Sequence, residues 1–169
     1  MTKVKQVSAG FVVFRYTKDG PKFLLLYDRG HDWNFPRGKL AAEEKSFFGA
    51  LRETQEETGL KRNDLRIKRG FRAYERFTFL NREKEKVFKT IIFYLAETSN
   101  KQIKLSHEHD GFGWFLYDDA SKLLTSHKER WVVLKKAKEF IYQSHQMKDV
   151  NFSHHPSLKE RYLKRRQPH

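Results

Sequence analysis

The sequence predicts a mixed α/β domain in which a sheet is layered with helices. Runs of β-branched and aromatic residues alternate with amphipathic helical stretches. The length of 169 residues suits one domain with a short extra segment, and fifteen phenylalanines can fill much of a compact core. We therefore expect residues 1–146 to form the domain and residues 147–169 to form a basic C-terminal extension.

The beginning of the chain predicts a hairpin followed by an irregular loop. Val7–Tyr16 is rich in β-branched and aromatic residues, which is typical of a buried strand. Phe23–Tyr27 is a second apolar run that can pair back to it, because Lys18–Pro21 is a strong turn signal. The glycines and the proline of residues 30–38 indicate an irregular backbone there.

Residues Glu43–Thr58 have the pattern of an amphipathic helix. Phe47, Ala50 and Leu51 give this helix an apolar side, and Gly59 is well placed to end it. Beyond the helix we expect strands at Leu65–Ile67, Phe71–Leu80, Val87–Ala96 and Gly113–Tyr117, and helices at Asp118–Leu124 and Lys128–Gln146.

The formal net charge of +14 lies mostly inside the domain. Residues 61–104 hold thirteen Lys and Arg against five Asp and Glu, and residues 147–169 hold six against two. Such a field attracts polyanions, whether nucleotides, nucleic acid or acidic lipid headgroups. The chain has no cysteine, which excludes disulfides, thiolate nucleophiles and zinc–thiolate sites. Because no apolar run is long enough to span a bilayer and no signal peptide is evident, we expect a cytoplasmic protein without a membrane partner.

The C-terminal extension has its own pattern. Asn151–Pro156 predicts a linker, and Ser157–Arg166 predicts a short basic helix that could pack on the domain, stay loose or bind polyanions. The adjacent His154 and His155 have no evident third ligand, so they do not by themselves predict a metal site.

Three carboxylates share one face of the predicted helix. Glu53, Glu56 and Glu57 stand at positions i, i+3 and i+4, where like charges repel and weaken a helix unless something compensates. Arg52 lies four residues before Glu56 and can brace that carboxylate, but it cannot neutralise all three. A hard divalent cation can, and Mg²⁺ binds through a few carboxylates, waters and substrate phosphates. The pattern therefore predicts phosphate chemistry.

The segment from Gly38 to Leu60 resembles the Nudix box, G-x5-E-x7-R-E-U-x-E-E-x-G-U. All seven fixed residues are present at the required spacing, and Glu44 is one of them. Thr54 replaces the aliphatic residue that the family prefers, but a β-branched side chain can still pack on the buried face. The resemblance implies a Nudix fold, with a mixed sheet sandwiched between helices. It also implies an enzyme that hydrolyses a nucleoside diphosphate linked to another group.

The same resemblance assigns roles within the box. It implies that Glu53, Glu56 and Glu57 bind Mg²⁺, for which Mn²⁺ can substitute, and that one of them can act as the base. It also implies that Gly38 turns the chain and offers a neighbouring carbonyl to the metal, and that Arg52 braces the carboxylates. The choice of base stays open, because these carboxylates titrate as a coupled set.

Two further segments resemble asymmetrical diadenosine tetraphosphate hydrolases. Leu105–His109, followed by Trp114, matches their L-S-x-E-H…W stretch. The resemblance implies that Glu108 reaches the metal site from outside the box. The strand Lys89–Glu97 matches their K-T-x-x-Y-[WF]-L-A-E strand, which implies that Lys89 contacts phosphate as a point charge.

The stretch before the box resembles two groups of enzymes. Residues 31–39 fit the W-x-x-P-[KR]-G pattern of dinucleoside polyphosphate hydrolases and the W-x-F-P-[KR]-G-K pattern of mRNA-decapping Nudix enzymes. His31, Arg37 and Lys39 are the substrate contacts expected there, and Lys39 favours the decapping pattern. An adenine would be sandwiched by aromatic side chains, for which the candidates are Tyr74, Phe77, Phe79 and Tyr117.

These features predict a hydrolase that converts diadenosine tetraphosphate into ATP and AMP. The alternative is an RNA 5′-end hydrolase that removes a cap or a pyrophosphate, which the charge of +14, Lys39 and the basic extension favour. The hairpin between Phe71 and Val87 is also longer than the dinucleotide hydrolases lead us to expect. A non-catalytic binding module is disfavoured, because every carboxylate of the box is intact.

Overall fold

The structure is a computed structural model that describes residues 4–154. It divides into two compact units, Met1–Ala137 and Lys138–His169. The elements are β1 (Val4–Thr17), β2 (Gly20–Asp28), β3 (Trp33–Asn34), β4 (Arg37–Lys39), α1 (Ser46–Thr58), a 3-10 turn (Arg62–Asp64), β5 (Arg66–Ile67), β6 (Ala73–Leu80), β7 (Lys86–Glu97), β8 (His109–Leu116), α2 (Tyr117–Leu124) and α3 (Lys128–His154).

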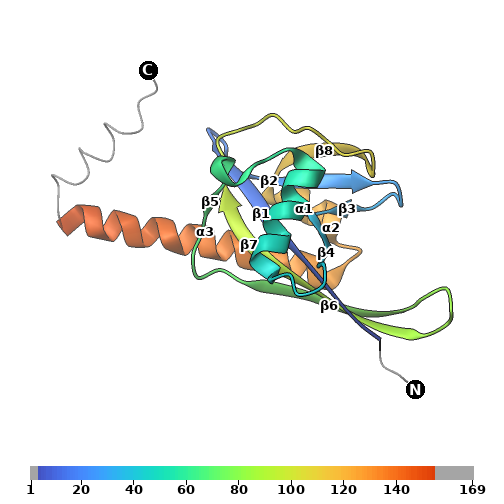
Figure 1. Cartoon of the computed structure of the whole chain (residues 1–169). Helices are drawn as coiled ribbons and strands as arrows, with labels where there is room; N and C mark the ends of the chain where they lie inside the picture. Colours follow the sequence, from blue (N-terminus) through green and yellow to red (C-terminus); the bar gives the residue numbers. More distant parts are fainter. Residues whose placement is uncertain (1–3, 155–169) are drawn as a thin grey trace. The chain divides into compact units, whose positions relative to one another are not determined.

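The strands of the first unit form one mixed sheet around β1 (Figure 1). β1 runs parallel to β7 from Val4 to Phe14. The other edge of β1 pairs with two strands: Ser8–Gly10 pairs with β4, and Phe14–Thr17 pairs with β2. β6 extends the sheet antiparallel to β7, and β8 extends it antiparallel to β2. This arrangement holds β4, where the box begins, beside the middle of the sheet.

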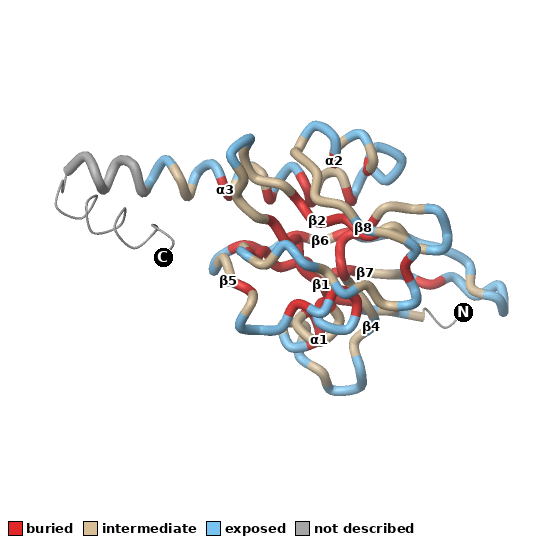
Figure 2. Tube along the Cα trace, turned by 90° about the horizontal axis from the view of Figure 1, so that it is seen from above, coloured by how far each residue is buried: buried red, intermediate tan, exposed pale blue. Residues whose placement is uncertain are grey.

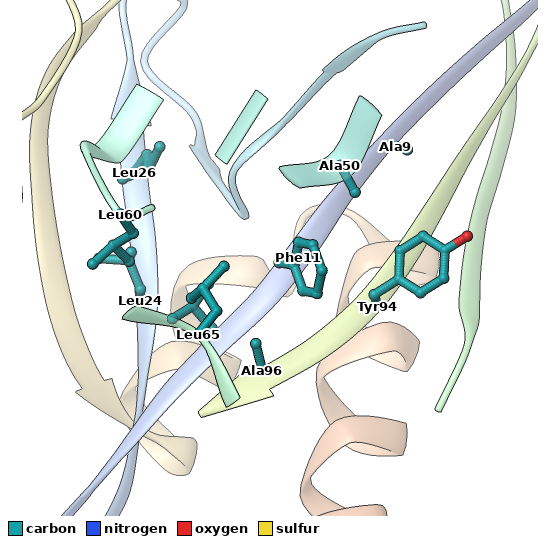
Figure 3. Packing of buried hydrophobic residues seen from close by; sticks show 10 residues of the cluster. Ala9, Phe11, Leu24, Leu26, Ala50, Leu60, Leu65, Tyr94 and Ala96 are labelled. Carbon is teal, nitrogen blue, oxygen red and sulfur yellow. The ribbon is translucent and has the colours of Figure 1, made fainter. Parts of the chain in front are cut away.

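The two faces of the sheet are covered by different helices. Figure 2 shows α1 on one side of the sheet and α2 on the other. Beneath α1 lies a buried apolar cluster that includes Phe11 of β1, Tyr94 of β7, Ala50 of α1 and Leu60 (Figure 3). A fully buried Leu or Phe side chain contributes roughly 1.5–3 kcal/mol relative to an exposed one. This cluster therefore fixes α1 on the sheet, as the apolar side of the predicted helix requires.

The helix α1 begins later than predicted and ends where predicted. Glu43 has a φ of 63°, which is left-handed rather than helical, and the first helical residue is Ser46. At the other end Gly59 has a φ of 75° and its N–H donates to the carbonyl of Gln55 at 2.8 Å. Glycine adopts this conformation at no steric cost, which explains the position of the helix end.

Three predictions about elements need correction. Residues 30–38 are not wholly irregular, because β3 pairs with β2 and β4 pairs with β1. β8 begins at His109 and not at Gly113. The helix α3 continues past Gln146 to His154, so residues 151–154 are helical and not a linker. Sheet pairing depends on distant strands, which local sequence does not encode. The predicted basic helix at 157–166 lies outside the described residues.

Within residues 4–154, no helix combines the length and the apolar character needed to cross a membrane.

Candidate active site

The carboxylates of α1 lie against β4, at the first glycine of the box. The backbone N–H of Arg37 donates to Oε2 of Glu57 at 3.0 Å. The backbone carbonyl of Lys39 accepts a hydrogen bond from Nη2 of Arg52 at 3.0 Å. These two bonds join α1 to β4 on either side of Gly38 and hold the helix against the strand.

Gly38 leaves room for the Glu53 side chain. The carboxylate of Glu53 occupies the position that a Cβ atom on residue 38 would need. Any side chain at residue 38 would have to displace this carboxylate. The glycine of the box is therefore required by close packing on Glu53, in addition to any part it has in turning the chain.

Arg52 is the centre of an ion-pair network. Its Nε and Nη2 donate to the two carboxylate oxygens of Glu44 at 2.8 and 2.9 Å, and its Nη1 lies 2.8 Å from Glu53 and 3.3 Å from Glu56. The guanidinium and the N–H of Ala41 lower the pKa of Glu44 to about 2. These carboxylates in turn raise the pKa of Arg52, Glu44 most of all. Arg52 therefore braces the carboxylates, and most of its donors are already used.

Glu57 is held in an environment that disfavours its charge. The residue is only 5% exposed. Burial, opposed by the N–H of Arg37 and assisted by the charges of Glu53 and Glu108, raises its pKa to about 8. Burial also raises the pKa of Glu53, and Glu56 and Glu108 add to the effect while Arg52 opposes it. The carboxylates therefore lie close together in a partly buried site, where their like charges repel.

The loop before β8 brings Glu108 to this site. The N–H of Lys104 donates to the carbonyl of Thr58 at 2.9 Å, and the N–H of Ser106 donates to the carbonyl of Glu57 at 3.2 Å. These bonds tie the loop to the C-terminal end of α1. His109, the first residue of β8, is buried: its Nε2 lies 3.8 Å from Oε1 of Glu57, and burial is the main cause that lowers its pKa.

The donor set at this site suits a hard divalent cation. Glu53, Glu56, Glu57 and Glu108 offer oxygen ligands, and their mutual repulsion is what a bound cation would relieve. In the part of the chain that is described, no three side chains are already gathered as a complete metal site. Arg52 instead holds Glu53 and Glu56 through its Nη1.

A basic strip lies on the face of the sheet that points away from α1, since Gly38, between two members of the strip, is the residue of β4 that faces Glu53. Arg37 and Lys39 of β4 pair with Gly10 and Ser8 of β1, and Lys89 of β7 pairs with Gln6 of β1. Alternate residues of a strand face the same side, so the three basic side chains share one face. The pKa of Lys89 is lowered by burial and then by the charges of Arg37 and Lys39. We call Arg37, Lys39 and Lys89 the basic strip.

Of the four aromatic residues predicted to contact a base, the structure brings only Phe77 and Phe79 together on one face. Phe77 of β6 pairs with Lys89, whose Nζ lies 6.0 Å from the centre of its ring, and Phe79 follows on the same face. Tyr74 faces the other side of β6, where Arg76 lies over its ring. Tyr117 is the first residue of α2, beyond the opposite end of β8 from His109.

His31 lies in an exposed turn and not in the carboxylate network. It has a φ of 64°, and its Nδ1 is 3.2 Å from the hydroxyl of Tyr27. Like the aromatic candidates, His31 stays a predicted substrate contact.

One cluster beside the basic strip had no signal in the sequence. Arg130 of α3 is 5% exposed, and its Nη1 donates to Asp32 and to the carbonyl of Trp33, both at 2.8 Å. Its Nη2 lies 3.3 Å from Glu75 of β6. Glu75 and Arg130 line a cavity of about 380 Å³ together with Phe77, Ser126, His127, Lys128 and Glu129. These residues are far apart in the chain, so local patterns do not reveal them. Glu44 and His109, in contrast, stand within the recognisable motifs.

Comparison with known proteins agrees with this architecture. A family model described as the NUDIX domain matches residues 5–137. The asymmetrical bis(5′-nucleosyl)-tetraphosphatase of Mus musculus is 36% identical in an alignment of 124 positions that covers 71% of this chain and 80% of the mouse protein. An RNA pyrophosphohydrolase of Salmonella arizonae is 30% identical in an alignment of 122 positions that covers 65% of this chain and 69% of that protein.

A solved structure gives the same result. The crystal structure of a C. elegans Ap4A hydrolase in a binary complex aligns with a TM-score of 0.71 at 28% identity, over 82% of this chain and 98% of that one. The match of the family model ends at Ala137, where the first compact unit also ends. With the complete box folded as a helix against a mixed sheet, these matches establish that the chain belongs to the Nudix family.

Proposed function

We propose that this chain hydrolyses a phosphoanhydride bond of dinucleoside polyphosphates, and that it converts diadenosine tetraphosphate into ATP and AMP. The proposal depends on one observation at β4, where carboxylates of α1 and the basic side chain of Arg37 lie close to each other. The backbone of Arg37 binds Glu57, while its side chain belongs to the basic strip. A polyphosphate on the strip can reach the carboxylates beside β4, where the charge of Arg37 acts on Glu57. The mouse and C. elegans relatives, named for the hydrolysis of such compounds, support this assignment.

We propose that Glu53, Glu56, Glu57 and Glu108 hold Mg²⁺, for which Mn²⁺ can substitute, with a backbone carbonyl next to Gly38 as a further ligand. When bound, the cation supplies charge neutralisation and a bound water of lowered pKa. The crowding of carboxylates around the buried Glu57 supports a cation at this position.

The protein groups supply positioning and proton transfer. Arg37, Lys39 and Lys89 hold the polyphosphate chain as fixed positive charges. One carboxylate of the site accepts the proton of the attacking water. Arg52 keeps the carboxylates in place through Glu44 and the carbonyl of Lys39.

The cavity beside Phe77 suits a nucleotide base. Its volume of about 380 Å³ is in the range of small-molecule sites. Phe77 and His127 both line it and have rings on which a base could stack, and Phe77 also lies beside Lys89. A base in this cavity would place its phosphates towards the basic strip, which supports Phe77 over Tyr74 and Tyr117 as the stacking residue.

RNA 5′-end hydrolysis is the second candidate. The net charge of +14 and the similarity to the Salmonella RNA pyrophosphohydrolase favour it. An RNA substrate would offer additional phosphates to the lysines and arginines.

Product analysis by chromatography separates the two candidates. Purified protein is incubated with Mg²⁺ and either diadenosine tetraphosphate or short 5′-triphosphorylated or capped RNA. We expect fast release of ATP and AMP from the dinucleotide and slow action on RNA; the reverse ranking would move the function to RNA 5′ ends. Glu56→Gln serves as the inactive control, because it removes a carboxylate that we propose as a ligand of the cation.

A further inference from the structure

The hairpin formed by β6 and β7 continues beyond the proposed base cavity. Phe77 and Phe79 stand on the same face of β6, and their ring centres are 6.2 Å apart. They are 40% and 38% exposed, so each presents a large part of its ring to solvent. Figure 1 shows the two strands extending away from the rest of the sheet towards their shared turn. The hairpin therefore carries an aromatic surface that begins at the cavity and leads outwards.

The turn of the hairpin has a defined conformation. The N–H of Asn81 donates to the carbonyl of Glu85 at 3.0 Å, and the N–H of Glu85 donates to Oδ1 of Asn81 at 2.8 Å. The side-chain amide of Asn81 also binds the carboxylate of Glu85 at 2.9 Å. An ordered turn holds the aromatic surface in one orientation, which lowers the entropy lost when a ligand binds.

The hairpin is positively charged. Residues 76–89 contain five Lys and Arg against two Glu. One of these two acids, Glu85, is bound to Asn81. Aromatic rings interleaved with cations are the features that bind single-stranded nucleic acid, because every base can stack on a ring and every linkage carries a phosphate.

We propose that the face bearing Phe77 and Phe79 binds the 5′ segment of a single-stranded RNA whose 5′ polyphosphate lies on the basic strip. The inference rests on the proposed function in one respect, namely that the first base occupies the cavity beside Phe77. The second base then stacks on Phe79, and the following phosphates meet the cations of the turn, Arg82 and Lys84.

The direction in which a ligand extends from the cavity favours RNA over a dinucleoside polyphosphate on this surface. In RNA the second nucleotide is attached through the ribose of the first, so it continues outwards from the cavity along the hairpin. In a dinucleoside polyphosphate the second base is reached only through the phosphates, which lead from the cavity towards the basic strip and the carboxylates. Phe79 thus lies on the path of an RNA chain.

The test is a binding measurement in EDTA, so that nothing is cleaved. Fluorescence anisotropy gives the dissociation constants of 5′-triphosphorylated ligands of one and five nucleotides, each labelled at the 3′ end. Phe79→Ala is compared with Phe88→Ala, a matched control that is 37% exposed and pairs with Thr78 on the opposite face of the same hairpin.

We expect the wild-type chain to bind the pentanucleotide about fivefold or more tightly than the mononucleotide, a modest effect for bases stacked on an aromatic surface. The increase in affinity with ligand length should be lost in Phe79→Ala and kept in Phe88→Ala. The proposal is overturned if the wild-type chain gains nothing with length, or if the two variants behave alike.

A second measurement leaves Phe77 and Phe79 unchanged. Arg82→Gln with Lys84→Asn removes two exposed charges, and Asn tolerates the left-handed backbone of residue 84. For the pentanucleotide, the slope of log K against log salt should become shallower by about 1.4. An unchanged slope would contradict the proposed path. Wild-type turnover of diadenosine tetraphosphate in Mg²⁺ reports separately on the proposed function, because binding in EDTA needs no catalysis.

Discussion

The carboxylate of Glu44 receives two parallel hydrogen bonds from the guanidinium of Arg52, at 2.8 and 2.9 Å. This bidentate pair fixes the plane of the guanidinium, and it leaves Nη1 directed at Glu53 and Glu56. Glu44 therefore fixes the position from which Arg52 donates to the proposed metal ligands Glu53 and Glu56.

Substituting Glu44 should weaken metal binding without removing a proposed ligand. In Glu44→Gln, Arg52 loses its main charged partner and is expected to bind Glu53 and Glu56 more tightly, in competition with the cation. We expect the Mg²⁺ concentration for half-maximal activity to rise by about 10–100-fold, as is typical when a residue behind a metal ligand is replaced. Mg²⁺ titration of the initial rate measures this change. Glu43→Gln, at the exposed neighbouring position, is the control, and equal shifts in both variants would contradict the role given to Glu44.

A side chain at residue 38 should disturb the site more than one at another strand glycine. In Gly38→Ala the new Cβ meets the carboxylate of Glu53, whereas in Gly111→Ala the nearest atom is 3.8 Å away. We expect Gly38→Ala to lose about 1–3 kcal/mol of stability, the usual cost of overpacking, and to need more Mg²⁺ for activity. Urea unfolding and Mg²⁺ titration test both effects. If Gly38→Ala proved as stable as Gly111→Ala, the close packing on Glu53 would be wrong.

The raised pKa of Glu57 makes the stability of the metal-free protein depend on pH. Because the folded state favours the protonated carboxyl, Glu57 costs nothing below its unfolded pKa of about 4.5, and the cost grows as the pH rises to about 8. Relative to Glu57→Gln, the wild-type chain in EDTA should therefore lose roughly 2–5 kcal/mol of stability between pH 4.5 and pH 9. Urea unfolding of both proteins at several pH values measures the difference. Parallel stability curves would show that Glu57 is not strained by its burial.

Lys89 should matter for substrate binding more than a lysine on the opposite face of the same strand. Lys89 belongs to the basic strip, while Lys86 pairs with Leu80 and faces the other side. We expect Lys89→Gln to raise the KM for diadenosine tetraphosphate roughly tenfold or more, the effect of losing one charge-assisted hydrogen bond, and Lys86→Gln to leave it nearly unchanged. Steady-state kinetics at saturating Mg²⁺ give both values. Equal KM values for the two variants would remove Lys89 from the phosphate site.

Local sequence patterns were sufficient to predict the features that lie within one turn or one helix. Glu53, Glu56 and Glu57 share a face because helical geometry repeats every few residues, and Gly59 ends the helix because glycine adopts a left-handed φ freely. The family and the class of fold follow from the same local motif, and the match of the family model over residues 5–137 confirms both. The expected bracing of Glu56 by Arg52 is also found.

The residues that complete the site from distant parts of the chain could be identified only once the fold was known. The parallel pairing of β1 with β7 sets Lys89 on the same face as Arg37 and Lys39, and Arg130 reaches Asp32 across 98 positions of the chain. The side of β6 to which each aromatic ring points follows from strand register, which separates Tyr74 from Phe77. Such contacts depend on how the sheet assembles as a whole. No pattern within a single strand or helix contains that information, because a strand specifies its alternation but not its neighbours.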